Sequence, residues 1–312
     1  MLPEKQVIIA YGRGDNMKRV GMPDKSFDLL NKIFLTAIVI IVVYPLIFVI
    51  SASISDPAAV SSGKMWLLPI DITFDGYKLI LQDASIWLGY RNTIFYTTVG
   101  TLIHLFVLLP CAYALSRKEL MGRKYILWII LFTMMFSGGL IPTYLVIKTL
   151  GMLDTMWALV IPGVVGAWSI LVARTFFQQS IPDQLVEASK IDGASDFYIF
   201  LRIVLPLSLP IVAVMSLFHA VGLWNQYFNA LIYLSDRDKY PLQLILREIL
   251  VVNQMQLGEG SGEQTESLIE QVRTGGLIKY AVIIVSSLPL LIAYPFLQRF
   301  FVQGVLIGSI KE

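Results

Sequence analysis

Residues 187–206 read EASKIDGASDFYIFLRIVLP, a polar stretch that lies between two long apolar segments of the chain. Pro182 suits the first turn of a helix because its missing N–H is not needed there, and Asp183 beside it favours the positive end of the helix dipole. Asp192 and Gly193 form a natural end for that helix, since glycine readily takes the left-handed conformation that closes a helix. We therefore predict a short helix that begins near Pro182 and ends at Gly193.

The apolar segments on both sides have the composition of a membrane protein. Of the 312 residues, 56% are hydrophobic and only 15% are charged, which excludes an ordinary soluble domain. A helix needs about 20 apolar residues to cross a hydrocarbon core about 30 Å thick. Six runs have this length, and we read the first as a retained span because no small-residue cleavage site follows it. The runs cover roughly residues 32–54, 92–116, 125–148, 157–178, 206–232 and 277–298.

The distribution of Lys and Arg predicts the orientation of these spans, because basic residues near span ends accumulate on the cytoplasmic side. With both termini inside, fifteen of the 24 basic residues lie in cytoplasmic segments, and acids outnumber bases in the outer loop 235–275. The fifteen are Lys5, Arg13, Lys18, Arg19, Lys25, Lys32, Arg117, Lys118, Arg123, Lys124, Arg174, Lys190, Arg202, Arg299 and Lys311. This orientation also puts the polar stretch in the cytoplasm.

The predicted fold is therefore an all-α polytopic membrane protein with six transmembrane helices and both termini in the cytoplasm. Residues 1–29 form a cytoplasmic N-terminal segment, residues 30–301 form the six-span domain, and residues 302–312 form a cytoplasmic tail. A cytoplasmic loop at 181–206, which we call the finger, interrupts the six-span domain.

The second half of the finger predicts another short helix. Ser195 offers a side-chain cap for its first turn, and Pro206 marks its junction with the fifth span. Apolar side chains on this helix are Phe197, Phe200 and Leu201. The finger would then be a helix–turn–helix unit that projects from the membrane.

Spacing also predicts how the first helix of the finger is oriented. Three of its apolar residues recur every third position and so share one face, namely Leu185, Ala188 and Ile191. The alternative to a projecting finger is an interfacial helix that lies flat on the lipid headgroups, which Lys190 and Arg202 would permit.

Interruptions in the third and fourth spans allow two interpretations. Broken helices are tolerated at membrane depth where they face protein or a water-filled cavity, so these segments could line a passage. The other interpretation is that glycine and proline are simply commoner in membrane helices. The residues concerned are Gly138, Gly139, Pro142, Pro162, Gly163 and Gly166.

No metal site or catalytic residue is expected. Cys111 is the sole cysteine and lies in the second span, which excludes a disulfide framework and a thiolate metal site. His104 and His219 lie in different spans, and a lone intramembrane histidine more often forms a hydrogen bond between helices than binds a metal.

The chain also lacks an energy source of its own. Proton- or ion-coupled carriers usually keep ionisable residues within their spans, and none of the six runs has an internal carboxylate. The phosphate-binding pattern Gly-x-x-x-x-Gly-Lys-[Ser/Thr] of nucleotidases is also missing. An active transporter of this kind must take its energy from a partner, and an exposed finger is a suitable place for that contact.

The finger resembles the cytoplasmic "EAA" loop of the permease subunits of ABC importers. Glu187, Ala188, Gly193, Ile203, Leu205 and Pro206 match its fixed positions, and Ser189 replaces the usual second alanine. The six spans, the Trp224–Phe228 stretch and the ending Gln298–Gly304 extend the similarity over nearly the whole chain. The chain is thus similar to permeases of the carbohydrate class, such as the smaller maltose-transporter permease, and to the subgroup associated with oligosaccharide or polysaccharide-derived substrates.

This resemblance implies a type I ABC importer transmembrane fold in the cytoplasmic membrane of a bacterium. The implied function is a non-catalytic permease subunit that forms, with a second homologous permease, a pathway for a sugar by alternating access, with an oligosaccharide as the expected substrate. Two copies of a cytoplasmic ATPase would use ATP and Mg²⁺, an extracytoplasmic binding protein would deliver the sugar, and this chain would bind no cofactor and no nucleic acid.

In that family the finger is a coupling helix that docks in a cleft of the ATPase. The resemblance implies that Glu187 pairs with a basic residue there and that Gly193 supplies the sharp turn. The implied coupling residues are Glu187, Ala188, Ser189, Asp192, Gly193, Ala194, Ile203, Leu205 and Pro206.

Candidate sugar-binding residues gather late in the fifth span. Saccharides are held by aromatic faces together with amide or hydroxyl groups, and His219, Trp224, Asn225, Gln226, Tyr227 and Asn229 supply such groups. At 1.5 Å per residue from Pro206, His219 lies about 20 Å and Asn225 about 28 Å along the helix, towards the outer mouth. The alternative is that these residues form hydrogen bonds between helices and an aromatic belt.

Two other function classes remain open on the residues alone. A self-contained six-span channel or secondary carrier would work without an ATPase, and a membrane scaffold or receptor subunit would move no substrate. Neither class explains the pattern of the finger.

Overall fold

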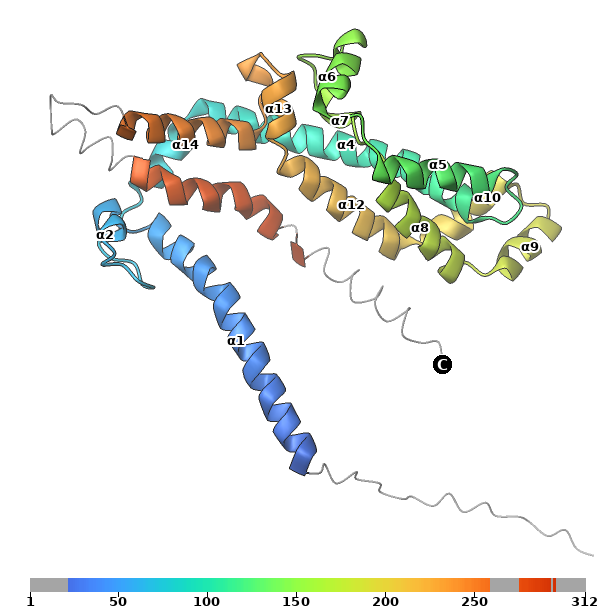
Figure 1. Ribbon diagram of the computed structural model, residues 1–312, viewed down its shortest axis with the longest axis horizontal. Helices are drawn as coiled ribbons and strands as arrows, with labels where there is room; N and C mark the ends of the chain where they lie inside the picture. The colour runs from blue at the N-terminus through green and yellow to red at the C-terminus, as the bar shows by residue number, and fades with distance from the viewer. Residues whose placement is uncertain (1–21, 259–274, 293, 296–312) are drawn as a thin grey trace, which may run out of the picture. The chain divides into compact units, whose positions relative to one another are not determined.

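The computed structural model describes residues 22–258, 275–292, 294 and 295, and within these ranges every regular element is a helix (Figure 1). The chain divides into two compact units, Met1–Phe48 and Val49–Glu312. Residues 1–21 of the predicted N-terminal segment 1–29, the ending at 298–304 and the tail at 302–312 lie outside the described residues.

The described part of the first unit is a single helix, α1 (Met22–Ser53), which continues five residues into the second unit. It begins ten residues before the predicted start of the first span, because Met22 to Asn31 already have helical backbone. Residues Ser26–Ser53 are long and apolar enough to cross a membrane, and Pro45 lies inside the helix.

The second unit is organised around α4 (Ala84–Ser116), whose first turn is capped by the Asp83 carboxylate through the Ser85 backbone N–H at 2.8 Å. Helices α12 (Leu209–Trp224) and α8 (Ala167–Ser180) pack along α4, and Figure 1 shows the three running together. A Cβ added at Gly100 of α4 would lie 2.4 Å from Leu223 of α12. The missing side chain therefore permits the close approach of these two helices.

The third and fourth predicted spans are not continuous helices. Helix α5 (Arg123–Met135) and α6 (Leu140–Thr149) meet at a bend of 115° across residues 136–139. Helix α7 (Trp157–Val160) is separated from α8 by an irregular segment at 161–166. Gly139 and Gly163 have φ values of 82° and 77°, which L side chains rarely adopt. The breaks thus fall at the glycines and prolines that the sequence indicates.

The fifth predicted span also differs from a single helix. Helix α10 (Asp196–Ile199), the π-helix η1 (Phe200–Val204) and α11 (Leu205–Leu207) form one continuous rod that bends by 79° into α12 at Ser208. The predicted junction at Pro206 is therefore two residues early, because Pro210 in the first turn of α12 sets the start of the new helix. Helix α12 ends at Trp224, and a separate helix, α13 (Phe228–Tyr233), follows.

The remaining described elements lie at and beyond the ends of these helices. They are α2 (Pro57–Ser61), α3 (Asp75–Gln82), α9 (Asp183–Ile191), the short helix η2 (Arg237–Lys239), α14 (Leu242–Gly258) and the helix Gly275–Ile292. Three residues at the start of α14 are fully buried, namely Leu242, Leu244 and Ile245.

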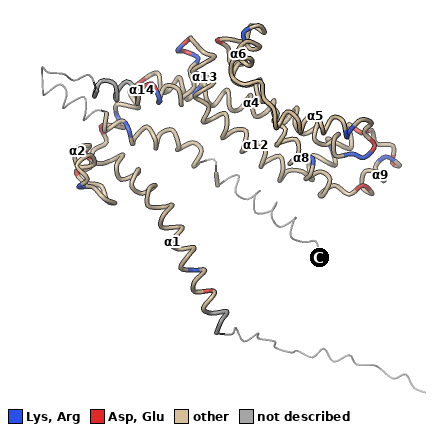
Figure 2. The backbone as a smooth tube through the Cα atoms, viewed as in Figure 1, with Lys and Arg blue, Asp and Glu red and all other residues tan. Residues whose placement is uncertain are grey.

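Three of the described helices can cross a membrane by length and composition, or five if each of two bent pairs is one span. The prediction of six helical spans differs from this count because the fourth run is divided between α7 and α8. Figure 2 shows that the charged residues of the second unit gather towards the ends of its long helices and leave the middle of α4 and α12 uncharged. This pattern is typical of helices whose middle portions lie in lipid.

Candidate functional site

The finger begins with α9, and its end has a specific hydrogen-bond pattern. Pro182 is the residue before the helix, and Asp192 follows its last residue. The Gly193 N–H donates to the Lys190 carbonyl at 3.0 Å, and the Ala194 N–H donates to the Ser189 carbonyl at 3.0 Å. Gly193 has φ +80°. These two bonds and the left-handed residue form a Schellman motif, so the predicted helix and its end at Gly193 are confirmed.

The second arm of the finger follows at once. The Ser195 hydroxyl oxygen accepts a hydrogen bond from the Tyr198 backbone N–H at 3.3 Å, which confirms the predicted cap of α10. Across the turn, Lys190 and Asp196 form an ion pair at 3.3 Å between α9 and α10. The predicted helix–turn–helix is therefore present. Backbone hydrogen bonds and the ion pair between Lys190 and Asp196 both stabilise its turn.

One side of α9 is attached to the bundle. Val186 packs in a buried apolar cluster with Phe177 of α8 and Ile199 of α10. Ser189 is buried on the same side, and its hydroxyl donates to the Leu185 carbonyl at 2.8 Å. Because its side chain faces the chain's own interior, Ser189 offers no side-chain contact to a partner.

Asp183 ties the start of α9 to the basic turn that follows α4. Its carboxylate accepts from Lys118 Nζ at 2.9 Å and from Arg117 Nη2 at 3.1 Å. The hydrogen bond from Lys118, together with the positive charges of both residues, lowers the pKa of Asp183 below its ordinary value. These two ion pairs attach the first arm of the finger to the basic turn.

The opposite side of α9 is open. Leu185, Ala188 and Ile191 share this side, as their spacing predicts, and Ile191 is 86% exposed. Glu187 is exposed between them. On the second arm, Phe197 is 72% exposed. The finger thus presents a small apolar surface next to the carboxylate of Glu187, a surface suited to a cleft in another protein.

The predicted coupling residues fall into two groups. Glu187, Ala188, Asp192, Gly193 and the half-buried Ala194 surround the open side and tip of α9, with Ser189 behind them. Ile203 and Leu205 are half-buried and Pro206 is exposed in the rod of η1 and α11 that leads to α12. The second group lies at the end of the finger, next to the bend at Ser208, where movement of the finger would reach the spans.

A cavity of about 370 Å³ lies where α7, α12 and α13 meet. Five of the six predicted sugar-binding residues line it, and Pro162 and Gly163 of the irregular segment after α7 complete its wall. The five are His219, Asn225, Gln226, Tyr227 and Asn229. The break after Trp224 brings them together, since residues 225–227 are not helical and turn towards α7.

Trp224 does not belong to this cavity. It is 5% exposed, and its Nε1 donates to the Ser286 carbonyl of the helix Gly275–Ile292 at 3.0 Å. Its ring packs in an apolar cluster with Ile86 and Val282. Trp224 therefore packs between α12 and the helix Gly275–Ile292 and, unlike the other five candidates, does not line the cavity.

The cavity has the chemistry of a site for a polyhydroxylated molecule. Its lining holds amide groups, one imidazole and aromatic rings, and none of its lining residues is Asp, Glu, Lys or Arg. The Asn225 amide donates to the Val221 carbonyl at 2.9 Å, which leaves the amide oxygen of Asn225 as an acceptor. Apolar walls with a few convergent polar groups are typical of small-molecule sites.

The two histidines contact each other at the inner side of this cavity. The rings of His104 on α4 and His219 on α12 are stacked with centroids 4.0 Å apart and planes within 5°. His104 Nδ1 donates to the Val164 carbonyl, so the hydrogen bond joins α4 to the irregular segment after α7 and not, as expected, to another helix. Among the described residues, no group of three or more His, Cys, Asp or Glu side chains is placed to hold a metal.

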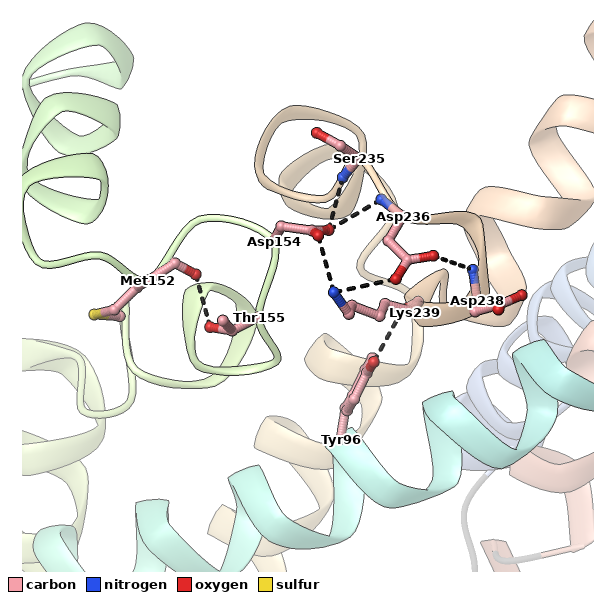
Figure 3. A network of polar contacts seen from close by, with 8 residues as sticks. All are labelled: Tyr96, Met152, Asp154, Thr155, Ser235, Asp236, Asp238 and Lys239. Atoms are coloured by element: carbon pink, nitrogen blue, oxygen red, sulfur yellow. Dashed lines mark hydrogen bonds and ion pairs between the residues drawn. The ribbon is translucent and has the colours of Figure 1, made fainter.

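A polar cluster joins the loops beyond the cavity (Figure 3). Asp154, between α6 and α7, accepts from the backbone N–H groups of Ser235 and Asp236 at 3.0 Å each and from Lys239 Nζ at 2.9 Å. Tyr96 of α4 donates its hydroxyl to the Lys239 carbonyl at 2.9 Å. The cluster thereby ties the loop before α7 to the loop after α13, and these two helices form opposite walls of the cavity.

This cluster was not evident from the sequence. Asp154 has φ +55°, a conformation that Asp and Asn tolerate better than other L residues, and its partners lie about 80 positions away. No local pattern marks such a pair, so only the tertiary structure reveals it.

Removal of the Asp154 charge is expected to weaken the outer loops in a pH-dependent way. Hydrogen bonds from Lys239, Asp236 and Ser235 lower the pKa of Asp154 from 3.8 to about 2. A lowered carboxyl pKa stabilises the folded state above pH 3.8, and this contribution is lost as the pH falls through about 2. Because the group is exposed, we expect Asp154→Asn to cost only about 0.5 to 1 kcal/mol at pH 6.

The measurement is the midpoint of thermal unfolding of the purified protein in detergent at pH 6 and at successively lower pH. Asp154→Asn should unfold roughly 1 to 3 °C below the wild type at pH 6, and the gap should close towards pH 2. Asp83→Asn is the matched control because an asparagine still caps α4. A gap that persists unchanged at low pH would contradict the role given to the charge.

Comparison with known proteins places this arrangement among transport proteins. Residues 84–307 match the family described as binding-protein-dependent transport system inner membrane component. The polygalacturonan/rhamnogalacturonan transport system permease protein of Bacillus subtilis (strain 168) is 42% identical over 93% of this chain and 100% of its own length. Protein LplC of the same organism is 40% identical over 92% of this chain and 95% of its own length.

A solved structure shares the fold. A chain in the crystal structure of a bacterial ABC transporter involved in the import of the acidic polysaccharide alginate superposes with a TM-score of 0.79 at 35% sequence identity. The match covers 90% of this chain and 98% of that chain. The likeness therefore extends over nearly all of both chains.

Proposed function

Since the chain belongs to the family of binding-protein-dependent transport system inner membrane components, we propose that it forms, with a second homologous permease, the sugar pathway of an ATP-driven importer. The chain is an ABC importer permease, and the partners follow from that role. Two copies of a cytoplasmic ATPase use ATP and Mg²⁺, an extracytoplasmic binding protein delivers the sugar, and this chain binds no cofactor itself. The complex lies in the cytoplasmic membrane of a bacterium, with both termini of this chain inside.

The observation that carries this proposal is the open side of the finger. Helix α9 keeps Val186 and Ser189 in contact with the bundle and leaves Leu185, Ala188 and Ile191 uncovered. Apolar side chains exposed outside the membrane spans cost free energy unless a partner covers them. The ion pairs of Asp183 and the Schellman motif hold both ends of α9 in place. A displacement of this surface is therefore transmitted to the bundle.

The path of that force runs through the second arm. The finger continues without interruption from α10 through η1 to α11, and the only sharp change of direction is the 79° bend at Ser208. Ile203, Leu205 and Pro206 lie in this rod. We place the coupling step there: closure of the ATPases moves the finger, the rod turns about Ser208, and α12 carries the movement to the cavity beside His219.

For the substrate we propose an oligosaccharide from an acidic polysaccharide. The relative from Bacillus subtilis is named for polygalacturonan and rhamnogalacturonan, and the solved transporter imports alginate. The cavity supports a sugar, because His219, Asn225, Gln226, Tyr227 and Asn229 offer aromatic and amide groups to hydroxyls. Alternating access would open this cavity first to the binding protein and then to the cytoplasm.

The experiment is to extract the tagged chain from native cells in mild detergent and to identify the bound proteins by mass spectrometry. We expect a second permease with the same finger pattern and an ATPase. The Glu119→Ala variant of this chain should still bind the second permease and the ATPase. This variant removes an exposed carboxylate from the basic turn beside the finger. Recovery of this chain alone, still transporting sugar after reconstitution, would instead establish a self-contained carrier.

A further inference from the structure

Arg247 lies next to Tyr227, an aromatic residue of the cavity wall. The guanidinium carbon of Arg247, on α14, is 5.3 Å from the centroid of the Tyr227 ring. Tyr227 itself lines the cavity. The residues that line the cavity include no Asp, Glu, Lys or Arg. Arg247 therefore adds a positive charge next to Tyr227, beside an otherwise neutral site.

Arg247 is exposed, and the structure pairs it with no carboxylate among the residues it describes. The other arginine of this region, Arg237, is paired with Glu248 at 3.6 Å. At 5.3 Å the guanidinium lies within cation–π distance of the Tyr227 ring, a contact that uses none of its N–H groups as hydrogen-bond donors. Tyr227 therefore attracts Arg247 while the N–H groups of Arg247 remain available to a ligand.

The backbone beneath Arg247 is rigid. Leu244, Ile245 and Leu246, the three residues before it, are buried with exposures of 0%, 0% and 2%. A Cβ added at Gly89 of α4 would lie 2.7 Å from Ile245 Cδ1, so α14 is pressed closely onto α4. The point from which the Arg247 side chain leaves α14 is therefore fixed by packing, as a binding residue on a rigid element requires.

The planar fork of arginine matches a carboxylate, to which it donates two parallel hydrogen bonds. A neutral sugar offers no such partner. Tyr227 adds a ring on which a pyranose can stack, and the amides of Asn225 and Asn229 can bind the hydroxyls of the same sugar. The cavity and Arg247 together thus suit a hexuronate residue, whose carboxylate extends from a hydroxylated ring.

We propose that Arg247, positioned by Tyr227, binds the carboxylate of a uronate residue at the edge of the cavity and so selects acidic over neutral oligosaccharides. This assignment rests on the proposed function, because it names a selectivity residue for that same pathway. It goes further in giving the selectivity to a side chain outside the cavity lining.

The test uses the complete complex in proteoliposomes with its binding protein, and it compares two probes. One is trigalacturonate, and the other is the neutral trisaccharide made by reducing its three carboxyl groups. We expect Arg247→Gln to lower the rate of ATP-dependent trigalacturonate uptake about ten- to one-hundredfold, the range for a lost charge-assisted hydrogen bond. Uptake of the neutral probe and ATP hydrolysis without sugar should stay within about twofold of the wild type.

Two further variants separate recognition from folding. Arg247→Lys keeps the charge without the fork and should lose less activity than Arg247→Gln. Arg237→Gln removes a neighbouring arginine already paired with Glu248 and should leave the ratio of the two probes unchanged.

The outcomes distinguish this assignment from the proposed function. A wild-type complex that imports neither probe would contradict the proposed function itself. A wild-type complex that imports trigalacturonate, with Arg247→Gln equally active, would overturn only the role of Arg247. Equal loss of both probes, or of ATP hydrolysis, would also overturn it, because a structural defect has no preference for the acidic sugar.

Discussion

Glu187→Ala is expected to lower ATP-dependent sugar uptake by about 30-fold or more while the protein still inserts into the membrane. Glu187 is exposed on the open side of α9. In the proposed complex it meets a basic residue in the cleft of the ATPase, and loss of one partner of a buried charge pair costs about 2 to 5 kcal/mol. The bundle does not depend on this side chain, because α9 is attached through Val186, Ser189 and Asp183.

The measurement is uptake of labelled oligosaccharide by cells, beside the amount of the chain in the membrane fraction and its thermal midpoint in detergent. Glu119→Ala is the matched control, since Glu119 is another exposed carboxylate on the same end of the bundle. If Glu187→Ala takes up sugar at the wild-type rate, the coupling role of α9 is contradicted. Loss of inserted protein would show that Glu187 has a structural role instead.

Gly193→Asp is expected to have an effect of similar size for a different reason. Gly193 has φ +80°, and no atom lies within 4 Å of where a Cβ would be placed, so the cost comes from the backbone and not from a clash. A residue with a side chain in this conformation costs about 1 to 2 kcal/mol, and Asp lies at the low end of this range because it tolerates the conformation better than most L residues. The added carboxylate also lies at the negative end of the α9 dipole. The Schellman motif should open and displace the tip of the finger.

A second glycine provides the matched control for this substitution. Gly122 has φ +76°, has open space around its Cβ position and lies at the start of α5, in the basic turn next to the finger. Gly122→Asp imposes the same strain without touching α9, and it should keep at least about half of wild-type uptake. Gly193→Asn should retain more uptake than Gly193→Asp, because asparagine tolerates the left-handed conformation and carries no charge. Equal loss in Gly122→Asp and Gly193→Asp would contradict a specific role for the tip.

The local features of the fold could be predicted from the sequence because short-range rules determine them. Gly193 and Ser195 act within a few residues of their own positions, so the end of α9 and the cap of α10 lie where the residues indicate. The glycines at 138, 139 and 163 likewise mark real breaks. The bend at Ser208 was misplaced because two prolines, Pro206 and Pro210, compete for it, and only packing decides which one begins the helix.

The features that depend on distant parts of the chain could not be predicted in the same way. Trp224 has the composition of a sugar-binding residue, yet the helix Gly275–Ile292 covers it. Asp154 and Arg247 had no role in the sequence interpretation, because their partners Lys239 and Tyr227 are identified only when loops and helices meet. Five of the thirteen residues that line the cavity were candidates from the sequence, and four of these five follow one another closely along the chain.

The central claim is that this chain moves sugar only when ATPases act on its finger. The most direct test is uptake of labelled trigalacturonate into proteoliposomes that contain either the purified complex with binding protein and internal ATP, or this chain alone. We predict uptake by the complex that stops without ATP and is lost in Glu187→Ala, and no uptake by the chain alone. ATP-independent uptake by the chain alone would contradict the account and identify a self-contained carrier.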